Sequence, residues 1–100
     1  MQEFLVEITT TVPDDASQDE VDQRRAAEAV RARELAATGN LVRLWRPVGQ
    51  LRSIGIWRAA DQDELNDKVL ATLPLRPWMT IMVTALESHP NDPGRTDATA

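Results

Sequence analysis

The chain has 100 residues, no cysteine and a formal net charge of -5, with 42% hydrophobic and 27% charged residues, which describes one small globular domain. The absence of cysteine excludes a disulfide scaffold, a thiolate metal site and a cysteine nucleophile, and the single histidine excludes a multi-histidine metal site within one chain. The acidic charge argues against a general nucleic-acid binder, because phosphate neutralisation needs a basic surface.

The first half of the chain predicts a strand followed by a long helix. Residues 3–12 are rich in β-branched side chains and alternate between two faces, as strands do. Ser17 and Glu20 form a capping box, which begins a helix that runs to residue 38. Gly39 then ends the helix, because glycine readily adopts the conformation that follows a helix C-terminus. The strand side chains expected to share one face are Phe4, Val6 and Ile8.

The second half predicts a hairpin, a second helix and a last strand. Residues 41–46 and 52–58 predict the two hairpin strands, Asp61 caps a helix that ends before Pro74, and residues 79–86 predict the fourth strand. The order strand, helix, strand, strand, helix, strand is typical of the ferredoxin-like α+β sandwich, in which four antiparallel strands carry both helices on one face.

We assign residues 1–88 to this single domain. Residues 89–100 are polar and rich in proline, and they predict a loose tail or an arm exchanged with another subunit. No segment approaches the roughly 20 apolar residues of a membrane span, and Met1 leads directly into a strand rather than a signal peptide. We therefore expect a cytoplasmic protein with no membrane partner.

The long predicted helix carries two apolar stripes. Two stripes are more than one sheet needs to cover, so they predict a second burial surface and self-association. The uncovered face of the sheet predicts the same. One stripe contains Val21, Arg25, Glu28, Ala32 and Leu35, and the other contains Ala26, Val30 and Ala37. The side chains expected to cover the bare sheet face through subunit contacts are Leu5, Leu51, Trp57 and Trp78.

Arg25 and Glu28 are unusual members of a stripe that otherwise faces the core. Burial would raise the pKa of the Glu28 carboxyl toward the range useful for proton transfer, and a neighbouring Arg would lower it again. The alternative is an ordinary ion pair at the rim of the stripe. Arginine also dominates the basic residues, since it supplies ten of the eleven and eight of these lie within residues 24–58. This cluster predicts either a local anion site or ordinary surface ion pairs.

Several short segments are distinctive in their order and spacing. They are FLVEI at 4–8, Val12-Pro13, Ala26-Ala27-Glu28, Gly39, Leu44-Trp45-Arg46-Pro47-Val48-Gly49, Leu73-Pro74-Leu75-Arg76-Pro77-Trp78-Met79 and His89-Pro90. Together they resemble the muconolactone isomerase family of the 3-oxoadipate (β-ketoadipate) route of aromatic hydrocarbon degradation. The resemblance spans nearly the whole chain and stops before the polar tail.

The resemblance implies a homo-oligomer, a decamer built from dimers, with no cofactor and an active site between subunits. The implied reaction moves the ring double bond of a butenolide with an acetate side chain to give the enol-lactone, by general acid/base proton transfer. Carried over by residue, it places the proton shuttle at Glu28. The candidates for binding the lactone carboxylate are Arg25, Arg43, Arg46, Arg76 and Trp78. Arg46 is equally well interpreted as stacked on Trp45, which is itself expected in the core.

The chain also departs from the family pattern. Arg43 stands where several relatives have histidine, Arg76 replaces an aromatic residue, and the chain has no tyrosine. Gln50, Leu51 and Ile54 occupy the region where relatives carry a histidine and tyrosines, and His89 is interpreted as an exposed linker residue. Two alternatives to the isomerase therefore stay open: an oligomeric lactone- or acid-binding protein without this activity, and a chloromuconolactone dehalogenase.

Overall fold

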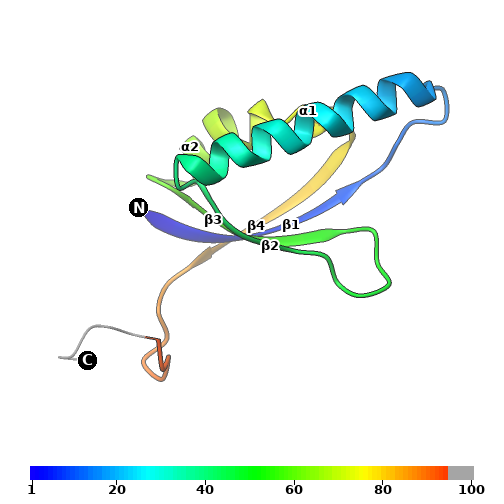
Figure 1. Ribbon diagram of the computed structural model, residues 1–100. Helices are drawn as coiled ribbons and strands as arrows, with labels where there is room; N and C mark the ends of the chain where they lie inside the picture. The colour runs from blue at the N-terminus through cyan, green and yellow to red at the C-terminus, as the bar shows by residue number, and fades with distance from the viewer. Residues whose placement is uncertain (95–100) are drawn as a thin grey trace.

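The sheet consists of four antiparallel strands in the order β2-β3-β1-β4. The computed structural model describes residues 1–94. The strands are β1 (Gln2–Thr10), β2 (Leu41–Trp45), β3 (Ser53–Ala59) and β4 (Met79–Leu86). Helix α1 (Gln18–Ala37) and the segment that begins with α2 (Gln62–Glu64) lie on the same face of this sheet (Figure 1). This arrangement confirms the predicted ferredoxin-like α+β fold.

Helix α1 begins and ends where the sequence predicts. The Ser17 hydroxyl oxygen accepts a hydrogen bond of 3.1 Å from the backbone N–H of Glu20, which satisfies one of the free donors at the helix start. After the helix, Gly39 has a φ of 87°, a conformation that side chains with a Cβ rarely adopt. Both ends of α1 are therefore determined by local sequence.

The second helical segment is less regular than expected. It begins at α2, where an Asp61 carboxylate oxygen accepts a 2.8 Å hydrogen bond from the Glu64 N–H, and it continues as a π-helical turn (Leu65–Val69) and a 3₁₀ turn (Leu70–Thr72). A π turn contains more residues per revolution than an α turn, so Leu70 comes round to the same side as Leu65. Both leucines are buried as a result, at 1% and 0% exposure.

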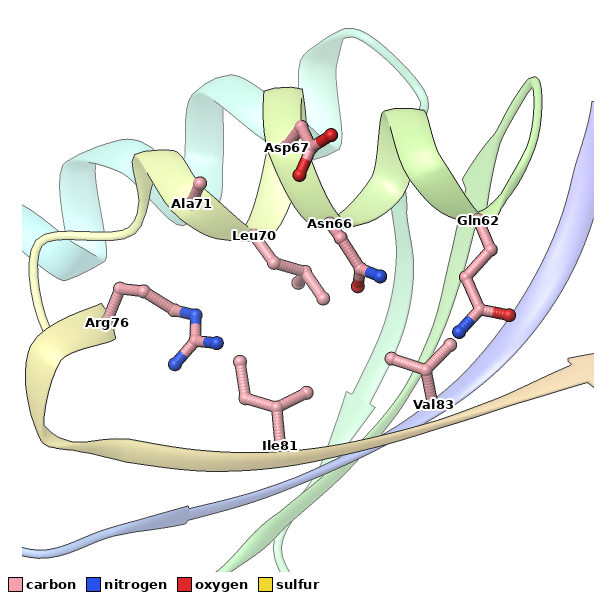
Figure 2. Close-up of a pocket in the computed structure, with 8 residues that line it drawn as sticks. All are labelled: Gln62, Asn66, Asp67, Leu70, Ala71, Arg76, Ile81 and Val83. Atoms are coloured by element: carbon pink, nitrogen blue, oxygen red, sulfur yellow. The ribbon is translucent and has the colours of Figure 1, made fainter.

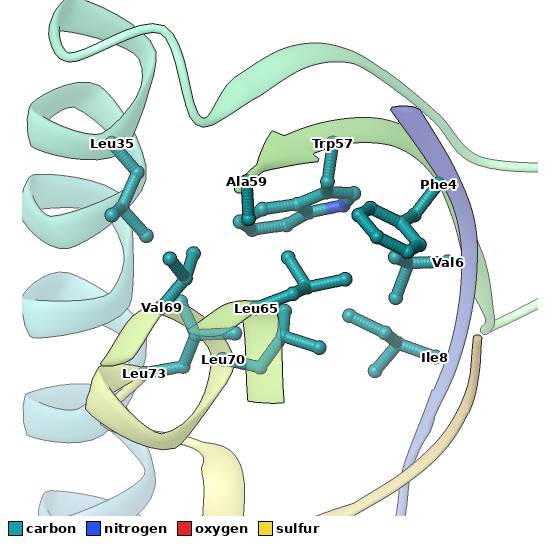
Figure 3. Packing of buried hydrophobic residues seen from close by; sticks show 10 residues of the cluster. All are labelled: Phe4, Val6, Ile8, Leu35, Trp57, Ala59, Leu65, Val69, Leu70 and Leu73. Carbon is teal, nitrogen blue, oxygen red and sulfur yellow. The ribbon is translucent and has the colours of Figure 1, made fainter. Parts of the chain in front are cut away.

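The core lies between the helices and the inner face of the sheet (Figure 3). Alternate residues of β1 and β3 point into it, and the register places Phe4 opposite Trp57. The expectation that Trp57 covers the other face of the sheet is therefore wrong, because its side chain is only 2% exposed and lies in the core. The buried cluster comprises Phe4, Val6, Ile8, Leu35, Trp57, Ala59, Leu65, Val69, Leu70 and Leu73.

Trp45 is the opposite case, since it was expected in the core and is 45% exposed. The cause is an irregularity in β2. Leu41 pairs with Trp57 of β3, and the register then shifts by one residue. After the shift, Leu44 pairs with Gly55 and Trp45 with Ile54. A bulge of one residue moves the following side chains to the other face of a strand. Leu44 therefore lies on the inner face and Trp45 on the outer face.

Several large apolar side chains are exposed on this single chain. Val30 on the outward stripe of α1 is 49% exposed, Met82 of β4 is 64% exposed, and Val48 and Leu51 of the β2–β3 loop are 100% and 91% exposed. Within residues 1–94, no helix is both long enough and apolar enough to cross a membrane. Residues 89–94 are exposed, while residues 95–100 of the predicted tail or exchanged arm lie outside the described residues.

Candidate functional site

A cavity of about 210 Å³ lies between α1, the inner side of strands β1 to β3 and the loop that precedes β4. Most of its lining is apolar, with a small number of charged and hydrogen-bonding groups, as in many sites for small organic molecules. The lining residues are Ile8, Thr10, Glu28, Ala32, Leu41, Leu44, Arg46, Leu51, Arg52, Ser53, Trp57, Leu73, Leu75 and Met79.

Glu28 is the carboxylate of this cavity, and it comes from the middle of α1. Its side chain is half-buried, and its Oε1 accepts a 3.0 Å hydrogen bond from the backbone N–H of Leu75. Burial raises the pKa of the Glu28 carboxyl above its ordinary value, and the hydrogen bond from Leu75 opposes that rise without cancelling it. A carboxylate with a raised pKa in an apolar cavity is suited to accept and return a proton.

Arg24 holds the loop that supplies this hydrogen bond. Its Nη1 donates to the carbonyl oxygen of Pro74 at 2.7 Å, and its guanidinium lies 4.8 Å from the ring centroid of Trp78. Both contacts fasten the segment around Leu75 to α1, on which Glu28 also lies. Arg24 is therefore a positioning residue of the cavity, and the sequence analysis did not single it out.

Two arginines line the cavity, and their environments differ. Arg52 contacts Glu7 at 3.2 Å and the side-chain oxygen of Gln50 at 2.6 Å, so its charge is already partly balanced. Arg46 takes part in no ion pair and no side-chain hydrogen bond among residues 1–94. Of the two cations, Arg46 is therefore the one available to a ligand carboxylate.

The structure brings together two of the six side chains that the sequence analysis proposed for the site, Glu28 and Arg46. Arg25 is exposed and does not line the cavity, which differs from its expected place on the inward stripe of α1. Arg43 lies on the outer face of the sheet, 4.7 Å from the ring centroid of Trp45. Arg43, and not Arg46, is thus the arginine stacked on this tryptophan.

Arg76 lines a different and more open cavity of about 490 Å³ (Figure 2). That cavity lies between the second helical segment and β4, and the Arg76 guanidinium also donates to the carbonyl oxygen of Met79 at 3.2 Å. Trp78 is half-buried beside Arg24 and is absent from the lining of the Glu28 cavity. Within one chain, neither residue reaches the site of Glu28.

Sequence reasoning missed the polar groups that β1 and β3 contribute. Thr10, Ser53 and Trp57 all line the cavity. The strand period of two would have found the two residues of β3, because Ser53, four positions before Trp57, must lie on the same face of the strand. Among residues 1–94, no group of three or more His, Cys, Asp or Glu side chains is arranged to hold a metal ion.

Comparisons with known proteins identify the family and agree with the fold. The family profile described as muconolactone delta-isomerase matches residues 2–92. The chain is 34% identical over 88 residues to the muconolactone delta-isomerase of Cupriavidus pinatubonensis, covering 88% of this chain and 95% of that protein. It is also 34% identical over 89 residues to the enzyme of that name from Rhodococcus opacus, covering 89% and 95%.

A solved structure gives the same result. The fold is similar to the crystal structure of muconolactone isomerase, with a TM-score of 0.84 and 30% sequence identity. The match covers 93% of this chain and 96% of that one, so both proteins share the whole domain and not a single motif.

Proposed function

The chain belongs to the muconolactone delta-isomerase family, and we propose that it is an isomerase that moves the ring double bond of muconolactone or a related butenolide acid. The product is the enol-lactone, and the reaction needs no cofactor. The observation that carries the proposal is the position of Glu28: a half-buried carboxylate with a raised pKa, in a mainly apolar cavity next to an arginine without an ion pair among the described residues.

The chemistry requires one group that removes a proton and returns it. The Glu28 carboxylate takes the proton from the ring carbon that bears the acetate side chain, and the C–H electron pair enters the ring. The charge spreads through the conjugated system to the lactone carbonyl oxygen, giving a dienolate. The protonated Glu28 then delivers the proton to the carbon next to the carbonyl, so atoms and charge balance and the carboxylate is regenerated.

Arg46 is proposed to bind the acetate group of the substrate. Its guanidinium can form two parallel hydrogen bonds with a carboxylate, which fix orientation as well as position. Arg52 also lines the cavity, but its pairing with Glu7 reduces the positive charge that it offers. With Arg46 holding the acetate, the lactone ring would occupy the apolar part of the cavity beside Glu28.

The functional form is proposed to be a homo-oligomer. Leu51 lines the cavity and is nevertheless 91% exposed, so the cavity wall is open at the β2–β3 loop. A second copy of the chain packed there would close the cavity and exclude water, and would cover apolar surface that a lone domain leaves in solvent. The other predicted residues, Arg25, Arg43, Arg76 and Trp78, would reach substrate only from such a neighbouring copy.

The direct test is the substitution Glu28→Gln, assayed on muconolactone through the loss of its ultraviolet absorption. We expect a decrease in kcat of at least about 100-fold, the usual contribution of a general acid/base group. Glu34→Gln is the matched control, because Glu34 lies on the same helix, is exposed and contacts Arg31 at 3.4 Å. Size-exclusion chromatography and thermal unfolding should show that both variants fold and assemble as the wild type does. Unchanged turnover in Glu28→Gln would contradict the proposal.

The same assay separates the alternatives. A wild-type protein that binds muconolactone without isomerising it would be a binding protein on this scaffold. One that releases chloride from chlorinated muconolactones but leaves muconolactone unchanged would be a dehalogenase. We expect neither result, because the chain matches a curated muconolactone delta-isomerase over 88% of its length.

A further inference from the structure

The side chain of Trp57 contains a polar group that the fold leaves unused. Trp57 is only 2% exposed, and its indole Nε1 has no hydrogen-bond partner among the described residues. A buried donor without an acceptor destabilises the fold, and native proteins contain few such groups. Phenylalanine at this position would fill an apolar core without burying an unpaired donor. The presence of the indole N–H therefore indicates a partner outside the chain itself.

The indole nitrogen lies on the Gly55 side of the ring, near side chains that line the Glu28 cavity. A Cβ placed on Gly55 would lie 2.8 Å from Trp57 Nε1, so the nitrogen lies directly beside Gly55 on the inner face of β3. Gly55 separates Trp57 from Ser53, and both of these line the cavity. Figure 3 shows the indole nitrogen at the edge of the ring that faces away from Leu35 and Val69.

Glycine at residue 55 has no side chain that would cover this N–H. Any Cβ there would also lie 3.0 Å from the carbonyl oxygen of Arg43 and 3.1 Å from Cδ1 of Leu44. Leu44 is 50% exposed and lines the same cavity, so its side chain can rotate toward solvent when a ligand enters. A ligand oxygen could then reach the donor that the protein itself does not pair.

We propose that the indole N–H of Trp57 donates a hydrogen bond to the lactone carbonyl oxygen of the bound butenolide acid. The inference rests on the proposed function. Negative charge develops on this oxygen when Glu28 removes the ring proton, and a donor fixed in a water-poor site stabilises such charge far better than one in bulk water. The indole keeps its proton throughout, since Glu28 alone carries the transferred proton. Trp57 would thus supply a hydrogen-bond donor from β3, the strand in which relatives carry tyrosines and this chain has none.

The first test observes the N–H directly by NMR of protein labelled with ¹⁵N-tryptophan. The three indole signals are assigned with the variants Trp45→Phe, Trp57→Phe and Trp78→Phe. The probe is the ring-saturated lactone acid, which keeps the carbonyl and the acetate but has no double bond to move. Its binding is followed separately by calorimetry and by inhibition of turnover.

We expect the Trp57 indole proton to move downfield and to exchange more slowly with solvent as the probe saturates the protein. The signal of Trp45 should move little, because that side chain lies on the outer face of the sheet. An unmoved Trp57 signal at saturating or inhibiting probe concentration would overturn the proposal. This measurement uses the wild-type protein, so it does not depend on whether a Trp57 variant folds.

The second test compares Trp57→Phe with Trp45→Phe in the isomerase assay, because Trp45 is exposed on the outer face of the sheet. At residue 57, phenylalanine keeps an aromatic ring in the core and removes only the donor and part of the ring. Loss of one donor to a developing oxyanion typically costs about 100- to 1000-fold in kcat, and we expect Trp57→Phe to fall near the lower value, with Trp45→Phe close to wild type. A folded Trp57→Phe protein with wild-type kcat would contradict the proposal.

The two proposals fail in different ways. If Glu28→Gln abolishes turnover while the Trp57 signal ignores the probe, the isomerase proposal survives and the donor role does not. If the wild-type protein has no isomerase activity but its Trp57 signal responds to the lactone acid, the proposed function is wrong and the N–H remains a ligand donor.

Discussion

The substitution Gly55→Ala tests the tight geometry that places the Trp57 N–H beside the cavity. The new methyl group would lie 2.8 Å from Trp57 Nε1, closer than real Cβ contacts come, and 3.0 Å from the Arg43 carbonyl oxygen, closer than most of them. Neither neighbour can yield easily, because one belongs to a rigid ring in the core and the other to the paired backbone of β2. The substitution therefore forces β2 and β3 apart or tilts the indole.

Overpacking of this kind costs about 1–3 kcal/mol of unfolding free energy. For a domain of about 100 residues, each kcal/mol lowers the Tm by roughly 5 °C, so we expect a decrease of about 5–15 °C. Exchange of Gly for Ala also stiffens the unfolded chain, which offsets up to about 1 kcal/mol of the loss. A net loss of stability should remain.

Urea and thermal unfolding, at one fixed protein concentration because assembly contributes to stability, measure this effect. Gly94→Ala is the control, since that glycine is exposed and the nearest neighbour of a Cβ there, the carboxylate of Asp92 at 3.3 Å, belongs to an exposed side chain that can move aside. The double variant Gly55→Ala/Trp57→Phe should cost less than the sum of the two single changes, because removing the nitrogen relieves one of the close contacts. A Gly55→Ala protein as stable as the wild type would refute the packing that places the N–H at Gly55.

Four further results are expected. First, the acid limb of the pH profile of kcat/KM should have a midpoint above the ordinary glutamate pKa, because burial raises the pKa of the Glu28 carboxyl. A midpoint at or below the ordinary glutamate pKa would contradict the assignment of the base. Secondly, the pKa of Glu28 is higher in the folded state than in the unfolded state, so the protonated carboxyl favours folding. The stability of the wild type relative to Glu28→Gln should therefore fall as the pH rises from the ordinary glutamate pKa through the raised one. Urea midpoints measured across the acidic range would show this decrease. Thirdly, Arg46→Met should raise KM by about 10- to 100-fold through loss of a charge-assisted hydrogen bond, whereas Arg33→Met, at an exposed position of α1 outside both cavities, should leave KM nearly unchanged; equal effects would exclude a special role for Arg46. Finally, Leu65→Ala, at a fully buried position, should cost about 2–5 kcal/mol in urea unfolding, and a smaller loss would mean that the π-helical turn relaxes into the space.

The elements of the fold could be predicted because their signals are local. The alternation in β1, the Ser17 cap and Gly39 each act within a few residues, and the structure has each where it was predicted. The outward position of Trp45 could not be predicted in the same way. It depends on one bulge in β2, which changes the face of every later side chain in that strand and leaves no mark in the hydrophobic pattern. The face of Trp57 depends instead on the regular pairing of β3 with β1, which places it opposite Phe4.

The site shows the same division. Glu28 was found from a carboxylate on an apolar helix stripe and from the family resemblance, and both signals lie close to it in sequence. Its hydrogen bond to the Leu75 N–H and the attachment of that loop through Arg24 join residues about half the chain apart. Such contacts appear only when the chain has folded, because neither partner has a distinctive local pattern.

The central claim is that Glu28 breaks the C–H bond at the ring carbon that bears the acetate group. Deuterium NMR of muconolactone that carries deuterium at this carbon measures the step directly, since the label leaves the carbon only when the C–D bond is broken. The account predicts loss of the label from this carbon with the wild-type protein and with Glu34→Gln, and none above the enzyme-free background with Glu28→Gln at a concentration where calorimetry shows the lactone bound. Loss of the label at the wild-type rate in Glu28→Gln would contradict the assignment of the base.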